Sequence, residues 1–298
     1  MTAVVIEKGE KGAKGAPKQQ AGQAALRKAR AWTTARFVLL MFFVLFFLLP
    51  VYVLLVTSFK PATETDPAHA WALPHHWTFE GWRAAWTEIS PGLANSLKVA
   101  IPGALISAVL GSLNGYVLSK WRFPGADVVF TLFLFGMFIP YQAVMIPLVQ
   151  LFVNMNIIYS LPSLTLAHIV YGIPICTLIM RNYYASIPDE LVEAARVDGA
   201  GMLRTYWNII VPNSAPAFAV VIIWQFTSIW NDFLFAVFLT GNSNYTATVH
   251  LNNLLGAQTV NFNQPMAGAL ITSAPTLLIY VLLGRFFMRG MMAGALKG

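Results

Sequence analysis

The chain has 298 residues, of which 57% are hydrophobic and 10% are charged, with a mean hydropathy of +0.62. Its apolar runs are too long for the helices of a soluble core, so the composition indicates a polytopic helical membrane protein. The formal net charge of +7 raises the question of nucleic acid. However, the basic residues cluster at the amino terminus and beside the apolar runs, which is typical of cytoplasmic flanks and argues against nucleic-acid binding.

The residue types that most often hold metals do not form a metal site in this sequence. Cys176 is the single cysteine and lies inside an apolar run, so it is expected to be a small buried hydrophobe. His69, His75 and His76 share one polar segment, but no cysteine or carboxylate stands near them at ligand spacing. No metal is therefore expected to bind this chain.

Residues 1–34 are rich in Lys, Ala, Gly and Gln and show no apolar period. This composition predicts a disordered basic tail that ends in a short basic helix. The apolar run at 37–56 is too long for the core of a signal peptide, and no small-residue cleavage site follows it. This run is therefore expected to remain as the first membrane span.

Apolar runs long enough to cross about 30 Å of hydrocarbon recur along residues 35–298. They predict one all-α transmembrane domain with six spans and with both termini on the same side of the membrane. The expected spans cover residues 37–56, 93–118, 128–153, 161–184, 215–239 and 266–288.

Charge orients these spans, because Lys and Arg gather in cytoplasmic loops. The tail, the loops after the second and fourth spans and the carboxyl end hold most of the basic residues, all on one side. On the other side, the loops 154–160 and 241–265 hold no Lys, Arg, Asp or Glu. Both termini are therefore expected in the cytoplasm, and the chain in the plasma (inner) membrane with lipid around it.

The first outer segment, residues 58–91, contains the four tryptophans Trp71, Trp77, Trp82 and Trp86. Tryptophan prefers the boundary between lipid and water. The segment is therefore expected to hold a short helix that lies on the membrane surface, rather than a ligand cage.

Two pairs of glycines, Gly111 with Gly115 and Gly290 with Gly294, have a spacing that lets helix backbones approach closely. This spacing predicts tight packing between helices. It does not identify the partner helix.

Asp232 is the one acidic residue expected within a span, whereas Lys98 lies near the outer end of the second span and can extend to the interface. One acid does not form the relay that an ion-coupled carrier needs. Amides and hydroxyls in the spans suit a neutral hydroxylated solute, although hydrogen bonding between helices explains each of them equally well. The expected solute path comprises Asn114, Gln142, Gln225, Ser228, Asn231 and Asp232, with Gln150, Asn154, Thr227, Thr272 and Ser273 as further candidates.

The polar stretch 186–212 separates the fourth and fifth spans, and its first half holds four of the twelve acidic residues. Pro188 suits the first turn of a helix, Asp189 complements its positive end, and Gly199 and Gly201 end it about three turns later. The sequence therefore predicts a short, capped surface helix.

One face of this predicted helix is formed by Leu191, Ala194, Ala195 and Asp198. The two alanines make the face shallow, which suits entry into a groove on another protein. A second amphipathic segment is expected over residues 202–211.

The second segment places Tyr206 and Trp207 at the membrane interface and ends at Pro212. Together, the two short helices and their glycine turn predict a rigid handle joined directly to the fourth and fifth spans.

These residues resemble the EAA loop of ABC-importer permeases. The match consists of Glu193-Ala194-Ala195, then Gly199, then Ile209, Val211 and Pro212, with Val211 where Leu is more usual. The longer run 193–200 is similar to the maltose-type carbohydrate branch, and residues 230–233 and 291–298 resemble the shorter, six-span permease of a pair. The stretch 168–184 looks most like the glucose or mannose members. The resemblance covers about residues 35–298.

The resemblance implies the fold of a type I ABC-importer permease and a coupling helix that docks into a dimeric cytoplasmic ATPase. The residues implied in coupling are Glu193, Ala194, Ala195, Asp198, Gly199 and Ala200. Further partners implied are a second permease subunit and an extracytoplasmic solute-binding protein, which the outer loop 241–265 would contact.

The sequence has no Gly-x-x-x-x-Gly-Lys-Ser/Thr phosphate loop, so ATP and magnesium are expected on the partner ATPase and no cofactor on this chain. The alternative function is a stand-alone secondary carrier or channel for a small polar solute. A membrane-embedded enzyme would need a catalytic cluster, and no His-Glu-x-x-His, serine elbow or paired intramembrane carboxylate is found.

Overall fold

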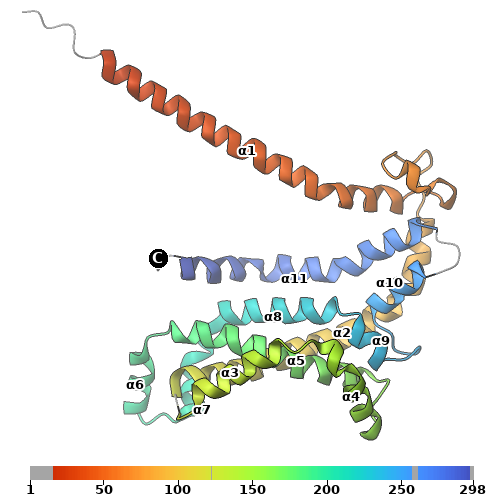
Figure 1. The fold of residues 1–298 in the computed structure, drawn as a ribbon. Helices are drawn as coiled ribbons and strands as arrows, with labels where there is room; N and C mark the ends of the chain where they lie inside the picture. Colours follow the sequence, from red (N-terminus) through yellow and green to blue (C-terminus); the bar gives the residue numbers. More distant parts are fainter. Residues whose placement is uncertain (1–15, 122, 257–260, 296–298) are drawn as a thin grey trace, which may run out of the picture. The chain divides into compact units, whose positions relative to one another are not determined.

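A computed structural model describes residues 16–121, 123–256 and 261–295 (Figure 1). Within these ranges the regular elements are all helical, as expected for an all-α membrane protein. The chain divides into two compact units, Met1–Val53 and Leu54–Gly298, and each is described by itself. Residues 1–15 of the predicted tail lie outside the described ranges.

The first unit contains most of helix α1 (Ala16–Ser58). The helix begins within the tail, for which a short basic helix was expected only at the end, because the Ala, Gln, Lys and Arg residues there are strong helix formers and continue the helix of the apolar run. Its segment Arg30–Ser58 is a candidate membrane span, and its large apolar side chains from Trp32 to Leu49 are exposed. A helix that is apolar on all sides needs lipid or another protein around it.

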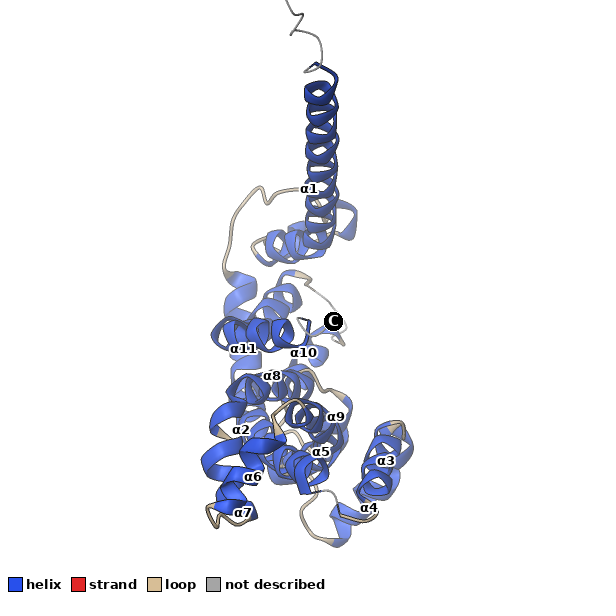
Figure 2. Ribbon diagram, turned by 90° about the vertical axis from the view of Figure 1, so that its left-hand side faces the viewer, coloured by secondary structure: helices blue, strands red, loops and turns tan. Residues whose placement is uncertain are grey.

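Among the described residues of the second unit, three further helices are long and apolar enough to cross a membrane. They are α2 (Glu80–Tyr116) with its π-helical end (Val117–Trp121), α5 (Leu161–Ala185) and the first part of α11 (Asn263–Ala295). Figure 2 shows α2, α5 and α8 packed in one bundle.

The amino-terminal part of α2 replaces the separate surface helix expected in the outer segment. Trp82 and Trp86 lie in the first turns of α2, which at 37 residues is about 55 Å long and extends beyond the hydrocarbon layer. The helix is continuous here because Ala85 and Ile89 are completely buried, and Ile89 lies against Gly268 of α11.

The run 128–153, expected as one helix, forms two helices that meet at 94°, α3 (Ala126–Met137) and α4 (Tyr141–Asn154). The break falls at Pro140, which lacks a backbone N–H and disfavours helical backbone in the residue before it.

The run 215–239 is also interrupted, because α8 (Ala215–Trp230) ends before α9 (Leu234–Leu239) begins. A helical segment, Met202–Ile210, precedes α8 at an angle of 48°. With each bent pair counted as one span, the described residues hold six candidate spans, the number that the sequence predicts.

The remaining elements are short. They are the 3-10 turns Ala62–Glu64, Pro67–His69 and Pro212–Ser214, the helices α6 (Asp189–Val197), α7 (Met202–Thr205) and α10 (Ala247–Leu255), and a second π-helical turn, Tyr206–Ile210.

Close packing of α2 against α5 forms the centre of the second unit. A Cβ atom placed on Gly111 would lie 2.8 Å from the carbonyl carbon of Cys176, and one on Gly115 would lie 2.7 Å from the backbone N of Arg181. The structure thus identifies α5 as the partner that the glycine spacing left open. Cys176 is completely buried, as expected. The second glycine pair lies where the side chains are not described.

Gly111→Ala is expected to destabilise the protein by about 1–3 kcal/mol, because the methyl group would overlap backbone atoms of α5 that cannot move locally. Gly136→Ala in α3 is the matched control, since no atom lies within 4 Å of its added methyl group. Thermal unfolding of the purified protein in detergent measures both changes. Equal midpoints for the two variants would contradict the packing described.

Candidate functional site

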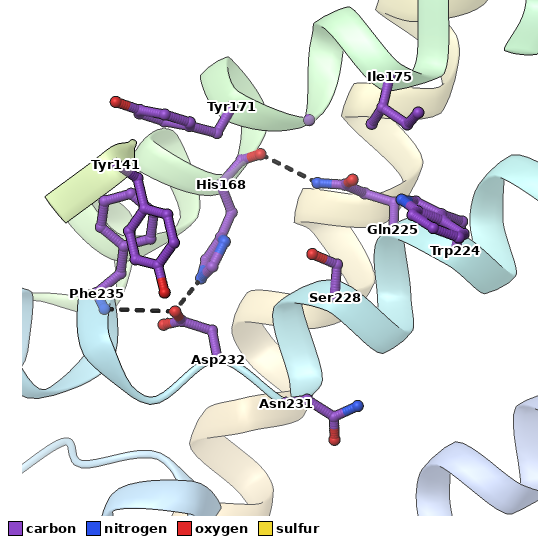
Figure 3. Close-up of a pocket in the computed structure, with 11 residues that line it drawn as sticks. Tyr141, His168, Tyr171, Ile175, Trp224, Gln225, Ser228, Asn231, Asp232 and Phe235 are labelled. Carbon is purple, nitrogen blue, oxygen red and sulfur yellow. Dashed lines mark hydrogen bonds and ion pairs between the residues drawn. The ribbon is translucent and has the colours of Figure 1, made fainter. Parts of the chain in front are cut away.

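A cavity of about 360 Å³ lies where α8 ends, between α4, α5 and α8 (Figure 3). Its lining combines aromatic rings with amide, hydroxyl, imidazole and carboxylate groups. The lining residues are Tyr141, His168, Tyr171, Gly172, Ile175, Trp224, Gln225, Ser228, Asn231, Asp232 and Phe235. A concave site of this size with a few polar groups among apolar ones is typical of small-molecule binding.

Asp232 occupies the break between α8 and α9, and its side chain is only 10% exposed. Its carboxylate accepts hydrogen bonds from the backbone N–H groups of Phe235 at 3.4 Å and Ala236 at 3.0 Å. These bonds satisfy amides at the start of α9 in the manner of a helix cap. The acid expected inside a span therefore has a structural role that explains why α8 and α9 are separate.

His168 on α5 is the polar residue of the cavity that sequence reasoning did not select. Its Nε2 atom lies 3.5 Å from a carboxylate oxygen of Asp232, is buried and has no hydrogen-bond partner (Figure 3). A histidine in an apolar run was the available signal, but its partner is distant in the sequence. The contact with Asp232 is longer than a normal hydrogen bond, so this imidazole nitrogen is buried beside the carboxylate without being fully satisfied.

Aromatic rings form one wall of the cavity. The ring of Phe235 lies 5.1 Å from Tyr141, 5.3 Å from Tyr171 and 5.5 Å from His168, measured between centroids. These residues come from α4, α5 and α9, so the break at Asp232 and the bend at Pro140 are both needed to bring them together. The wall supplies apolar area against which a flat ring can pack.

Gln225 fixes the distance between α5 and α8 beside the cavity. Its side-chain amide donates to the carbonyl of His168 at 3.1 Å and is buried. The same amide lies so close to Gly172 that a Cβ atom there would overlap its nitrogen, so a side chain at this position would require Gln225 to move. This residue was expected on the solute path; it lines the cavity and also makes a hydrogen bond between helices.

Four of the six residues expected on the solute path line the cavity, namely Gln225, Ser228, Asn231 and Asp232. Asn114 is half-buried on α2 and Gln142 is exposed on α4, and neither lines it. Of the further candidates, Gln150, Asn154 and Ser273 are exposed, Thr227 is half-buried and Thr272 is buried. The predicted solute-path residues that line the cavity therefore all lie in or next to the last turns of α8.

The second candidate site is the loop 186–212, which leaves the bundle at α6 (Figure 1). The helix ends as the glycines predict: Gly199 has a φ of +76°, its N–H donates to Arg196, and the N–H of Ala200 donates to Ala195 at 2.8 Å. This pair of bonds is a Schellman cap, which needs a left-handed residue and therefore favours glycine.

The rotation of α6 differs from the expected docking face. Val192 and Ala195 are buried on the inward side, so Ala195 does not face outward with Leu191 and Ala194. The helical period then places Glu190, Glu193, Ala194 and Val197 on the outward side, where Val197 is 88% exposed. Val192 determines this rotation because it joins the buried cluster below the loop.

Tyr206 is a second departure from expectation, because it is completely buried instead of lying at the membrane interface. Its hydroxyl is 2.7 Å from that of Ser112 on α2, so the ring points into the bundle. Trp207, next to it, is 54% exposed as the interface prediction requires.

Among the described residues, no group of three or more His, Cys, Asp or Glu side chains is arranged to hold a metal ion. The outer histidines make separate contacts instead. His69 lies 3.6 Å from Asp66, and the backbone N–H of His75 donates to Glu64.

Candidate membrane spans, a polar cavity and a projecting capped loop are the features expected of a membrane transport protein. Residues 100–292, which include both sites, match the binding-protein-dependent transport system inner membrane component family. The chain belongs to this family and is a permease subunit of an ABC importer, in which ATP hydrolysis takes place on another subunit.

Relatives extend this similarity over most of the chain. A probable ABC transporter permease of Pyrococcus horikoshii is 42% identical over 267 residues, covering 88% of this chain and 96% of the relative. A xylose/arabinose import permease of Haloferax volcanii is 36% identical (86% and 91% covered), and a glucose import permease of Saccharolobus solfataricus is 32% identical (83% and 88% covered).

The fold also matches a solved structure of a bacterial ABC transporter involved in alginate import, with a TM-score of 0.73 and 23% identity. The alignment covers 88% of this chain and 98% of that chain. The permease fold is therefore shared over nearly the whole of both proteins.

Asp232→Ala is expected to release the start of α9 and to cost about 1 kcal/mol, whereas Asp232→Asn keeps an acceptor and costs less. Hydrogen exchange at the amides of Phe235 and Ala236 measures the cap directly. Asn231→Ala is the matched control, since that side chain is exposed beside the same break. Unchanged exchange in Asp232→Ala would contradict the capping role.

Proposed function

We propose that this permease subunit carries a sugar across the plasma membrane and that α6 couples this movement to a separate ATPase. The xylose/arabinose and glucose permeases among its relatives support a monosaccharide as the solute. The observation that carries the coupling role is the outward side of α6, which is exposed, acidic and shallow, while Val192 and Ala195 on the opposite side are buried.

The outward side of α6 has the chemistry of a docking surface. Ala194 leaves room for a close approach, Val197 offers an apolar contact, and Glu193 offers a charge to a basic residue of the ATPase. Asp198 is exposed beside this surface, while Gly199 and Ala200 shape the turn that follows it. ATP and magnesium would bind the ATPase dimer, and closure of that dimer would move α6.

The cavity around Asp232 is proposed as part of the solute path. Its aromatic wall can pack against the apolar face of a sugar ring, and its amide, hydroxyl and imidazole groups can replace hydrogen bonds from sugar hydroxyls to water. At about 360 Å³ the cavity lies at the lower end of small-molecule sites, which suits a monosaccharide better than a long oligosaccharide.

The remaining partners follow from the same proposal. Both termini and α6 would face the cytoplasm, and the outer loop that contains α10 would meet an extracytoplasmic solute-binding protein. A second permease subunit would complete the passage. The exposed apolar sides of α1 and α3 would then contact that subunit or lipid, which their composition requires.

A matched pair of glycine variants tests the coupling role. An added Cβ atom meets no atom within 4 Å at Gly199 or at Gly201. However, Gly199 has a φ of +76°, whereas Gly201 has a φ of −73° and caps α7, where aspartate is favourable. Gly199→Asp is expected to reduce ATP-dependent uptake by at least about tenfold, and Gly201→Asp to retain most of it.

Glu193→Lys is expected to give the same loss as Gly199→Asp with normal membrane insertion, because it reverses the charge offered to the ATPase. The assay measures uptake of radiolabelled D-glucose, D-xylose and L-arabinose by proteoliposomes that contain the full transporter and its binding protein. Full uptake in both variants would contradict the coupling role. Uptake by this chain without the ATPase would instead support a stand-alone carrier.

Ser228→Leu tests the solute path in the same assay. The larger side chain would fill the cavity and is expected to lower uptake by about tenfold or more. Ser273→Leu is the matched control, because Ser273 is exposed on α11 and does not line the cavity. Equal uptake by the two variants would show that the cavity is not part of the solute path.

A further inference from the structure

The end of α2 contacts the start of α6 through Lys120. The ammonium group of Lys120, in the π-helical turn Val117–Trp121, lies 2.5 Å from a carboxylate oxygen of Asp189 and donates to the carbonyl of Ile187 at 2.5 Å. The Lys120 side chain is 3% exposed. The Asp189 side chain is 71% exposed, but the backbone carbonyl of Ile187 is a fixed acceptor, so the buried ammonium ties the start of α6 to the end of α2.

Trp121, next to Lys120, contacts the other end of α6. The guanidinium of Arg196 stacks on the indole of Trp121, 4.4 Å from the ring centroid. The indole N–H donates to the hydroxyl of Tyr116 at 2.8 Å, and that hydroxyl donates to the carbonyl of Met202 at 3.3 Å. One stack thus joins the last turn of α6 to the end of α2, and one hydrogen bond, from Tyr116, joins α2 to the start of α7, while the bond between Trp121 and Tyr116 holds these two side chains together.

A third contact lies one turn deeper in the bundle. The hydroxyl of Ser112 on α2 is 2.5 Å from that of Tyr184 on α5 and 2.7 Å from that of Tyr206, and all three residues are buried. The residues of α2 and its π-helical end that contact the loop therefore lie within positions 112–121, distant from the loop in the sequence, and α5 and α8 also pack against the loop.

We propose that Lys120 and Trp121 are positioning residues that make α6 move together with α2. This inference rests on the proposed coupling role of α6. Contacts at both ends of a helix fix its direction as well as its place, so α6 cannot swing without breaking one of them. When α6 is displaced, α2 is displaced with it. The displacement is therefore not limited to the chain segments that join α6 to α5 and α8.

The movement continues from α2 to the cavity through the glycine contacts. Gly111 and Gly115 hold α2 against the backbone of α5 at Cys176 and Arg181, and His168 lies further along α5 in the cavity wall. Close-packed backbones transmit displacement because neither side can yield locally. In addition to the buried cluster that α6 shares with α5, a route from the ATPase to the cavity therefore runs from α6 through α2 to α5.

The test is the number of sugar molecules taken up per ATP hydrolysed by the full transporter in liposomes. The probes are D-glucose, D-xylose and L-arabinose. This ratio does not depend on the amount of folded protein, so loss of fold alone does not change it. The variants are Lys120→Met and Trp121→Leu, with Tyr116→Phe as a smaller change that keeps the ring and removes the hydroxyl.

The matched controls lie on the same helix. Lys98→Met and Trp86→Leu make the same substitutions at exposed positions of α2. The ratio is expected to fall about tenfold in Lys120→Met and Trp121→Leu and about threefold in Tyr116→Phe, and to stay at the wild-type value in both controls. Lys120→Arg, which keeps the charge, is expected to restore most of the ratio.

A ratio of sugar molecules to ATP that stays constant in the variants, while uptake and hydrolysis fall together, would overturn the inference. If Lys120→Met and Trp121→Leu prevent assembly of the transporter, the same comparison is made with Tyr116→Phe. Hydrogen exchange gives a readout that needs no sugar, since the variants should expose the α6 amides several-fold more often than wild type. Unchanged exchange would also overturn it. Failure of the proposed function differs, because it would appear as absent ATP-dependent uptake in the wild type.

Discussion

The second unit depends on the backbone contact between α2 and α5. Gly111 and Gly115 allow α2 to lie directly against α5, and a side chain at either position would force the two helices apart. The cavity is built on one part of α5, through His168 and Tyr171, and the loop is held by the end of α2. Because the cavity and the loop 186–212 are both attached to the closely packed helices α2 and α5, a displacement of the loop also displaces the cavity wall.

The breaks in the helices are as necessary to the site as the continuous helices. Pro140 turns α4 away from α3 and brings Tyr141 to the cavity, while Asp232 ends α8 and starts α9 so that Phe235 faces the same space. A polar cavity inside a membrane requires that backbone amides freed by such breaks find partners. The carboxylate of Asp232 provides those partners, which explains an acid at this position without a proton relay.

Features encoded over a few residues were predictable from the sequence, including the six apolar runs, the buried Cys176 and the glycine end of α6. Features that depend on distant contacts were not. On α6, Leu191 with Ala194 and Val192 with Ala195 are both apolar pairs, so the period alone does not show which pair faces inward. Burial of Tyr206 depends on Ser112, and the role of His168 depends on Asp232, which is far away in the sequence.

Movement of α6 and α2 as one body can be measured as the distance between spin labels at Leu191 on α6 and Ile106 on α2, both exposed, in a Cys176→Ala background. Pulsed electron paramagnetic resonance would measure the distance distribution between the labels in the full transporter without nucleotide and in the transporter trapped with ATP. The account predicts the same distance distribution in both states. A shift of the mean distance when ATP binds would show that α6 moves independently of α2 and would contradict it.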